Sequence, residues 1–197
     1  MPPTSTDIVT IVSGLPRSGT SMMMRMIDAG GIPALTDHVR QPDDDNPRGY
    51  FEFEPVKRTK EDPSWLEQAT GRVVKMVYRL LYDLPPDRQY QVVFMRRKLQ
   101  EVIASQDVML SRRGRGGGGL SKEKLISLFG NQLREFEEWV VRQSNFRILY
   151  VHYNDTIKQP QATVNAVNEF LGGHMDTAAM LRVIEPDLYR QRAADAE

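Results

Sequence analysis

The chain has 197 residues, 40% of them hydrophobic and 26% charged, with 26 basic and 26 acidic side chains and no cysteine. The zero net charge gives no reason to expect a nucleic acid or an anionic membrane as a partner, and the lack of cysteine excludes disulfides, thiolate zinc sites and cysteine nucleophiles. We expect one domain over residues 1–197 and, since no apolar run approaches the roughly 20 residues of a membrane span, a cytoplasmic location.

Strands and helices alternate through the first half of the chain. Residues 8–13 form a short apolar run, rich in β-branched side chains, which predicts a strand buried on both faces. Residues 21–29 have helical character and end at a glycine pair, a frequent helix stop. A polar loop over residues 36–64 then leads to two more predicted strands, at residues 72–77 and 90–95.

The second half continues the alternation. Helical spacing predicts helices at residues 98–110, from Ser121 onward and at 160–171, and an apolar run predicts a strand at 146–153. Residues 112–119 contain four consecutive glycines and predict a mobile surface loop. The helix that begins at Ser121 has one apolar face, formed by Leu125, Leu128, Phe129, Leu133, Phe136, Trp139 and Val140. Strands separated by helices predict an α/β fold, a three-layer sandwich with a central parallel sheet.

The turn between the first strand and the first helix, residues 14–21, is the most informative segment. Its sequence is Gly-Leu-Pro-Arg-Ser-Gly-Thr-Ser, and a turn at this place directs backbone N–H groups toward the positive end of a helix dipole, where anions bind. The glycine spacing overlaps the nucleotide-binding pattern G-x-x-x-x-G-K-[ST], but Thr20 stands where that pattern has lysine. Arg17 can supply a cation instead. A glycine-containing turn without a ligand is the simpler alternative.

This turn resembles the 5′-phosphosulfate-binding loop of the P-loop sulfotransferases, especially the Pro-Arg-Ser-Gly-Thr version of tyrosylprotein sulfotransferases. The resemblance implies a P-loop nucleotide-binding fold and sulfuryl transfer from 3′-phosphoadenosine 5′-phosphosulfate (PAPS). It also implies that the loop binds the nucleotide through Pro16, Arg17, Ser18, Gly19, Thr20 and Ser21.

A second match with the family lies at the end of the third predicted strand. Family members have an arginine there and a serine eight positions later, and this pair holds the 3′-phosphate of the nucleotide. Arg97 and Ser105 have that separation, and an arginine fork suits a phosphate dianion. Arg96 competes for the role by one residue. A surface arginine cluster beside an ordinary helix is the alternative for this segment.

A third match covers residues 148–155 and the helix after them. It resembles the late strand of the family, whose tyrosine approaches the adenine, and Tyr153 is the matching residue. A tyrosine at the end of a strand is otherwise a packed side chain with its hydroxyl in water.

The sequence also departs from the family in two places. Many cytosolic sulfotransferases have Lys-x-His after the second strand, with the histidine as base, whereas here Lys75 is kept and Val77 replaces the histidine. The C-terminal Arg-Lys-Gly-x-x-Gly loop is missing. Residues 112–119 have a related composition, and it stays open whether they close over the nucleotide or form a solvated loop.

The base must therefore come from another segment. In tyrosylprotein sulfotransferases a glutamate some twenty residues beyond the loop arginine takes the proton, and Asp37 and His38 lie at that distance from Arg17. Glu52 and Glu54, set among aromatic residues, are the alternative. The resemblance thus gives Arg17 and Lys75 as catalytic cations and Asp37 or His38 as the base, which we rank ahead of the two glutamates.

The chemistry expected from the resemblance is in-line sulfuryl transfer from PAPS to a hydroxyl or amine on a small-molecule or peptide acceptor, without a metal. Residues 22–24, three methionines, are expected in the core, with a homodimer interface as the alternative. A small-molecule or nucleoside kinase that needs magnesium and ATP is the second hypothesis. A catalytically silent module that binds adenosine bisphosphate is the third.

Overall fold

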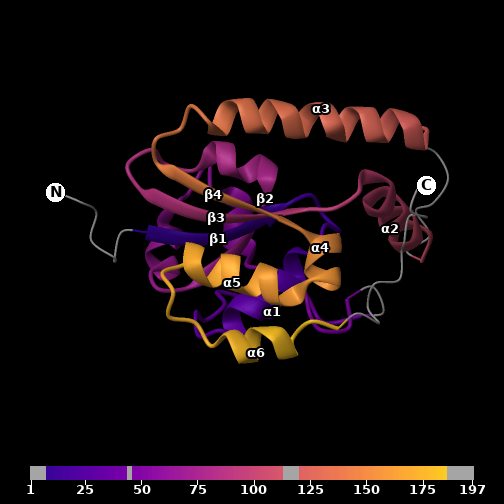
Figure 1. Ribbon diagram of the computed structural model, residues 1–197. Helices are drawn as coiled ribbons and strands as arrows, with labels where there is room; N and C mark the ends of the chain where they lie inside the picture. Colours follow the sequence, from indigo (N-terminus) through magenta and orange to yellow (C-terminus); the bar gives the residue numbers. More distant parts are fainter. Residues whose placement is uncertain (1–7, 44–45, 113–119, 186–197) are drawn as a thin grey trace.

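The computed structural model describes residues 8–43, 46–112 and 120–185. Four parallel strands form its sheet in the order β2-β1-β3-β4 (Figure 1). Their bounds are β1 Ile8–Gly14, β2 Val73–Val77, β3 Gln89–Arg96 and β4 Phe146–His152. All four lie where the sequence predicts strands, and the predicted parallel sheet is confirmed.

Six α-helices and three 3-10 helices surround the sheet in the described part of the chain. The α-helices are α1 Thr20–Ala29, α2 Leu99–Arg112, α3 Lys122–Val140, α4 Tyr153–Lys158, α5 Pro160–Phe170 and α6 Thr177–Arg182. The 3-10 helices are η2 Glu54–Arg58, η3 Ser64–Ala69 and η4 Tyr78–Asp83. The sequence does not predict α4, α6 or the 3-10 helices, because five or six residues are too few to repeat a helical period.

The helices form a layer on each side of the sheet (Figure 1). Successive strand residues point to opposite faces, so Ile11 belongs to one core cluster and Val12 to the other. The first cluster includes residues of α3 and of the 3-10 helices, and the second includes residues of α1, α4, α5 and α6. The predicted three-layer α/β sandwich is confirmed.

The two helices with the clearest sequence signals pack nearly as expected. Met23 and Met24 are fully buried, as predicted, whereas Met22, also expected in the core, is only partly buried. In α3, Phe136 and Val140 are buried, but Leu128 is 39% exposed. Both buried residues lie in the C-terminal half of α3, and the N-terminal half therefore covers less of the core. The predicted loop at residues 112–119 lies, except for Arg112, outside the described residues.

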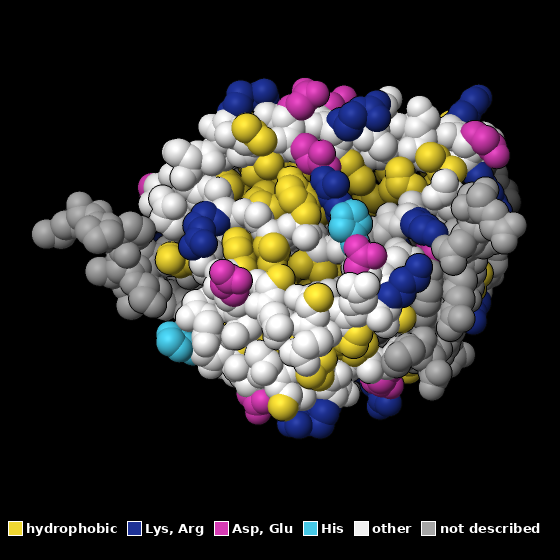
Figure 2. Space-filling view, in the orientation of Figure 1, with side chains coloured by type: hydrophobic (Ala, Val, Ile, Leu, Met, Phe, Trp, Pro, Cys, Tyr) yellow, Lys and Arg dark blue, Asp and Glu magenta, His cyan; other side chains and the backbone are white. Residues whose placement is uncertain are grey.

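β4 is an edge strand, and no described strand pairs with its other side. Ile148, Leu149 and Tyr150 are only partly buried there. Figure 2 shows hydrophobic side chains on this face of the molecule, between α3 and α5.

The parallel arrangement brings the carboxyl ends of all strands to one edge of the sheet. In register, Gly14 pairs with Val77 on one side and with Met95 on the other. Arg96 pairs with His152 at the same edge. The segments that follow these residues are the turn to α1, the residue Arg97 and the start of α4, so the residues highlighted by the sequence meet at the edge where α/β proteins bind ligands.

Candidate active site

The turn between β1 and α1 is closed by its own serine. The Ser18 N–H donates to the Leu15 carbonyl at 3.2 Å, and the Ser18 hydroxyl donates to the same oxygen at 2.7 Å. Gly19 has a left-handed backbone with φ of 99°, and a Cβ on it would lie 2.4 Å from Cδ2 of Tyr153. Glycine is required here because the tyrosine ring lies directly on the loop.

The N-terminus of α1 is left without a protein cap. Its first helical hydrogen bond runs from the Met23 N–H to the Gly19 carbonyl at 3.1 Å. No side chain caps the helix, and its first turn contains no acidic residue. The N–H groups of Thr20, Ser21 and Met22 have no acceptor within the helix and lie at the positive end of its dipole, an arrangement suited to a bound anion.

A cavity of about 500 Å³ opens in front of this helix terminus. Among the residues predicted for the site, those that line the cavity are Pro16, Arg17, Gly19, Thr20, Ser21, Lys75, Arg97, Ser105 and Tyr153. Ser18, Asp37 and His38 do not line it. Ser18 is buried beneath the loop, where it makes the two hydrogen bonds to Leu15.

Arg17 and Ser105 meet across the cavity wall. The Arg17 backbone is left-handed, with φ of 72°, and its Nε donates to the Ser105 hydroxyl at 2.9 Å. The sequence spacing paired Ser105 with Arg97 around a phosphate, whereas the direct contact in the structure is with the loop arginine. A non-glycine residue with positive φ costs about 1–3 kcal/mol and is often found at functional sites.

Arg97 and its neighbour Arg96 have different surroundings, and only Arg97 lines the cavity. Arg97 lines the cavity, and its guanidinium lies 4.5 Å from the ring centroid of Tyr153. Its Nη1 donates to the Arg17 carbonyl at 3.3 Å. Arg96 pairs with Glu137, lies 4.2 Å from the ring centroid of Tyr150 and does not line the cavity. The geometry therefore favours Arg97 over Arg96 as the arginine of this site.

Lys75 brings a largely buried amine to the same cavity. Its Nζ donates to the Tyr50 carbonyl and lies 3.4 Å from the Ser21 hydroxyl. Burial lowers the pKa of Lys75 to about 8, although the carboxylate of Glu52 acts in the opposite direction. A lysine beside an uncapped helix terminus adds a further cation to the cavity, which Arg17 and Arg97 also line.

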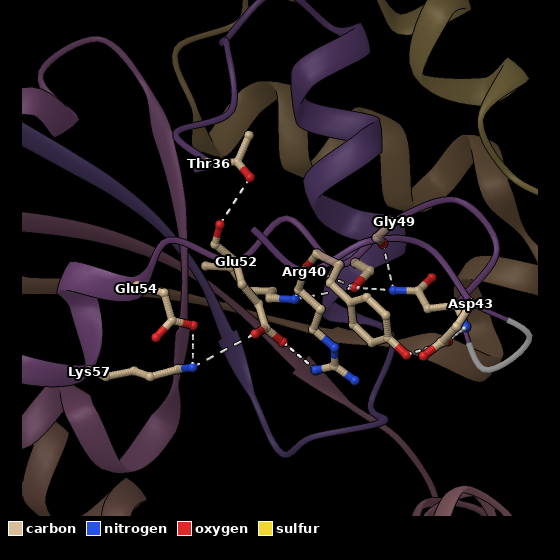
Figure 3. Close-up of polar contacts among 11 residues, drawn as sticks. Thr36, Arg40, Asp43, Gly49, Glu52, Glu54 and Lys57 are labelled. Carbon is tan, nitrogen blue, oxygen red and sulfur yellow. Dashed lines mark hydrogen bonds and ion pairs between the residues drawn. The ribbon is translucent and has the colours of Figure 1, made fainter. Parts of the chain in front are cut away.

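Glu52 is a carboxylate that lines the cavity, and Figure 3 shows it between Arg40 and Lys57. Arg40 donates to it at 2.6 Å, and Lys57 lies 4.0 Å from its second oxygen. The Arg40 guanidinium also lies 3.3 Å from the ring centroid of Tyr50, whose hydroxyl donates to Asp43 at 2.5 Å. Burial raises the pKa of Tyr50 to about 12. The phenol therefore stays protonated near neutral pH, and Glu52 is the anionic group of this wall.

The other candidate bases do not line the cavity. Asp37 accepts hydrogen bonds from the backbone N–H groups of Val39 at 3.0 Å and Glu54 at 2.6 Å. Slight burial tends to raise the pKa of Asp37, but these hydrogen bonds bring it below its ordinary value. His38 is exposed, and the carboxylate of Glu54 pairs with Lys57 at 2.5 Å. Asp37 thus connects two parts of the loop, at Val39 and at Glu54, through backbone hydrogen bonds.

Among the lining residues that the sequence did not single out, three form a cluster of ion pairs. Glu185 accepts hydrogen bonds from Arg25 at 3.0 Å and from Arg48 at 2.9 Å, and all three line the cavity. They come from α1, the following loop and the segment after α6, so no local spacing signals their meeting.

Within residues 8–43, 46–112 and 120–185, no group of three or more His, Cys, Asp or Glu residues could hold a metal ion. None of the described helices has the length and apolar character needed to cross a membrane.

Comparison with known proteins adds a family match and structural similarities. A family model for the sulfotransferase domain matches residues 120–187, a range that begins after the turn at residues 14–21. No curated protein sequence matches the chain.

Several solved structures are similar over nearly the whole chain. The structure of mouse sulfotransferase SULT7A1 complexed with PAP is 15% identical, with 98% of this chain and 69% of that chain covered and a TM-score of 0.56. The sulfotransferase domain of the Synechococcus PCC 7002 olefin synthase is 14% identical, with 100% and 92% covered and a TM-score of 0.52. Retinol dehydratase in complex with androsterone and the inactive cofactor PAP is 17% identical, with 96% and 65% covered and a TM-score of 0.52. At these identities the similarity establishes a shared fold.

Proposed function

We propose that this chain is a P-loop sulfotransferase that transfers a sulfuryl group from PAPS to a hydroxyl or amine acceptor, and the family model that matches residues 120–187 supports this proposal. One observation carries the proposal: a single cavity joins the uncapped N-terminus of α1 to three cationic side chains, Arg17, Lys75 and Arg97. Such a concentration of donors and positive charge is suited to a ligand with several anionic groups.

The described residues fit the two ends of such a nucleotide. The N–H groups of the first turn of α1, together with Arg17, would hold the 5′-phosphosulfate. Arg97 and Ser105 would hold the 3′-phosphate, and the ring of Tyr153, which contacts both Gly19 and Arg97, would border the nucleoside. The PAP in the structures of SULT7A1 and retinol dehydratase supports this choice of nucleotide.

The reaction would replace one bond to sulfur by another. The bond between sulfur and the phosphate oxygen breaks, a bond between sulfur and the acceptor atom forms, and the proton of the acceptor passes to a base. Arg17 and Lys75 would stabilise negative charge that develops on the departing phosphate. In this scheme the side-chain cations and the helix terminus take the part that a metal ion plays in many phosphoryl transfers.

The acceptor would be a small organic molecule with an apolar body. The lining of the cavity includes apolar side chains from four segments, namely Phe53, Val56, Met76, Leu80, Val108 and Met109. The androsterone in the retinol dehydratase structure supports an acceptor of this kind. A peptide acceptor is the alternative, and a homodimer stays a separate hypothesis.

Among the four candidate bases, the geometry favours Glu52, since it lines the cavity and Asp37, His38 and Glu54 do not. We predict that Glu52→Gln lowers the single-turnover rate by about 10²-fold, within the usual range for general base catalysis, and leaves nucleotide affinity unchanged. Asp37→Asn is the matched control, expected to affect stability more than rate. A normal rate for Glu52→Gln, together with a slow rate for Asp37→Asn or His38→Ala, would contradict this choice. The base would then be Asp37 or His38, which lie at the family's distance from Arg17.

A thermal-shift experiment with nucleotides tests the proposed function. 3′-Phosphoadenosine 5′-phosphate at a hundredfold excess over its dissociation constant should stabilise the fold by about 2.7 kcal/mol, and a chelator should not remove the effect. The competing hypothesis is a kinase, which would show a magnesium-dependent shift with ATP. That result, without any shift from the bisphosphate, would contradict the sulfotransferase proposal.

A further inference from the structure

Glu101 is a buried carboxylate directly behind the proposed nucleotide site. In the part of the chain that the structure describes, it is the one Asp, Glu, Lys or Arg residue that is buried, with 1% of its surface exposed. Burial of an unpaired carboxylate is very unfavourable, and such a group is retained only where partners compensate its charge. The partners of Glu101 therefore indicate what it does.

Two residues hold the Glu101 carboxylate from different sides. Arg97 donates through Nε to one oxygen at 2.8 Å. Asn154, the second residue of α4, donates through its side-chain amide at 3.1 Å and 3.3 Å to the two oxygens. The carboxylate thus links the first turn of α2 to the start of α4, beneath the edge of the sheet where the cavity opens.

The contact with Glu101 fixes the orientation of the Arg97 guanidinium. The guanidinium is planar, so its Nε contact with Glu101, its Nη1 contact with the Arg17 carbonyl and its stacking on Tyr153 determine the direction of the whole group. The side chain of Arg97 is only 8% exposed, yet it lines the cavity. A rigid, nearly buried arginine can discriminate between ligands by the position of their anionic group.

We propose that Glu101, held by Asn154, is a positioning residue that orients Arg97 toward the 3′-phosphate and so makes the site selective for 3′-phosphorylated nucleotides. This inference rests on the proposed function, because it requires that Arg97 faces the 3′-phosphate. Glu101 itself does not line the cavity and acts through Arg97.

A matched control lies one residue away. Arg96 pairs with Glu137 in the same kind of contact, but the two side chains are 31% and 37% exposed and neither lines the cavity. Glu137→Gln therefore removes a carboxylate partner from an adjacent arginine without touching the proposed nucleotide site.

The test compares two ligands, 3′-phosphoadenosine 5′-phosphate and adenosine 5′-phosphate, by calorimetry. We expect Glu101→Gln to weaken binding of the bisphosphate about tenfold, the lower range for a charged hydrogen bond, and to leave binding of adenosine 5′-phosphate nearly unchanged. Asn154→Ala should also weaken binding of the bisphosphate, by a smaller factor. If Glu101→Gln does not fold, the comparison of the two ligands is made with Asn154→Ala. Glu137→Gln should bind both ligands like the wild type.

A double-mutant cycle separates positioning from a general structural role. In an Arg97→Ala background, Glu101→Gln should cause no further loss of preference for the bisphosphate, because the residue that it orients is gone. Equal losses for both ligands, or an unchanged preference in both Glu101→Gln and Asn154→Ala, would overturn the inference while leaving the proposed function intact. A wild-type protein without preference for the bisphosphate would contradict the proposed function, and the inference would fall with it.

Discussion

Lys75 illustrates at the residue scale how burial changes the protonation of a side chain that lines the cavity. Its pKa falls from the ordinary 10.5 to about 8 because the charged amine loses water when the chain folds. Below about pH 8 the amine is protonated in both the folded and the unfolded chain, and the cost of burying the charge is present in full. Between about pH 8 and 10.5 the unfolded chain binds more protons than the folded one, so this contribution makes the fold more stable as pH rises.

The same lysine predicts how nucleotide binding depends on pH. A bound phosphate favours the protonated amine, so the affinity for 3′-phosphoadenosine 5′-phosphate should decrease as pH rises above about 8. The decrease should be at most about tenfold per pH unit for one linked proton. Lys75→Arg should lose this dependence, since an arginine stays charged. Calorimetric titrations at several pH values from neutrality to above the pKa measure both proteins, and the same decrease in Lys75→Arg would exclude Lys75 as its source.

At the scale of elements, the site depends on the junction between β1 and α1. The loop must turn with a positive φ at Gly19 so that the N–H groups of α1 face the cavity, and the Tyr153 ring from α4 packs on that glycine. The first turn of α1 and the start of α4 are therefore in contact at a position that has no Cβ.

Replacement of this glycine tests that contact. Gly19→Ala should cost about 1–3 kcal/mol for the left-handed backbone and more for the collision with Tyr153, and it should weaken bisphosphate binding. Gly31→Ala is the matched control, because Gly31 also has a positive φ, 108°, but a Cβ there has no atom within 4 Å. Urea unfolding and calorimetry give both quantities. Equal effects on stability and binding from the two substitutions would mean that backbone strain alone, and not the Tyr153 contact, constrains the loop.

At the scale of the whole molecule, the sheet joins two core clusters that lie on its two faces. Phe136 of α3 is fully buried in the first cluster, where it stacks on Phe94 of β3 with centroids 4.9 Å apart and meets Tyr78 edge to face at 6.0 Å. Since alternate residues of the same strands form the second cluster, we expect that loss of packing on one face destabilises the other face too.

A substitution in α3 tests this coupling. Phe136→Ala should lower the free energy of unfolding by about 3–5 kcal/mol, as for other large-to-small changes of buried aromatic residues. Leu128→Ala, in the exposed half of the same helix, should change it by less than about 0.5 kcal/mol. Urea unfolding followed by far-UV circular dichroism and by tryptophan fluorescence should give one coincident transition. Two separate transitions in Phe136→Ala would show that the layers unfold independently.

Much of the architecture could be predicted from the sequence because it depends on local patterns. Short apolar runs predicted all four strands, and helical spacing predicted α1, α2, α3 and α5 within a few residues. The site was predicted where the signal was also local: the turn at residues 14–21, and the eight-residue spacing of Arg97 and Ser105. These residues line one cavity, apart from Leu15 and Ser18 within the turn, and their roles stay predictions.

The sequence by itself therefore determined the layered α/β fold and the loop in front of α1, since hydrophobic period and glycine spacing act over a few residues. Only the tertiary structure decided which distant groups meet: Arg17 with Ser105, Glu101 with Asn154, and Glu52 rather than Asp37 at the cavity. The reason is physical. A carboxylate in a polar loop has the same sequence signature whether it faces solvent, backbone amides or a ligand, and its surroundings are set by distant chain segments, up to 160 residues away for Glu185 and Arg25.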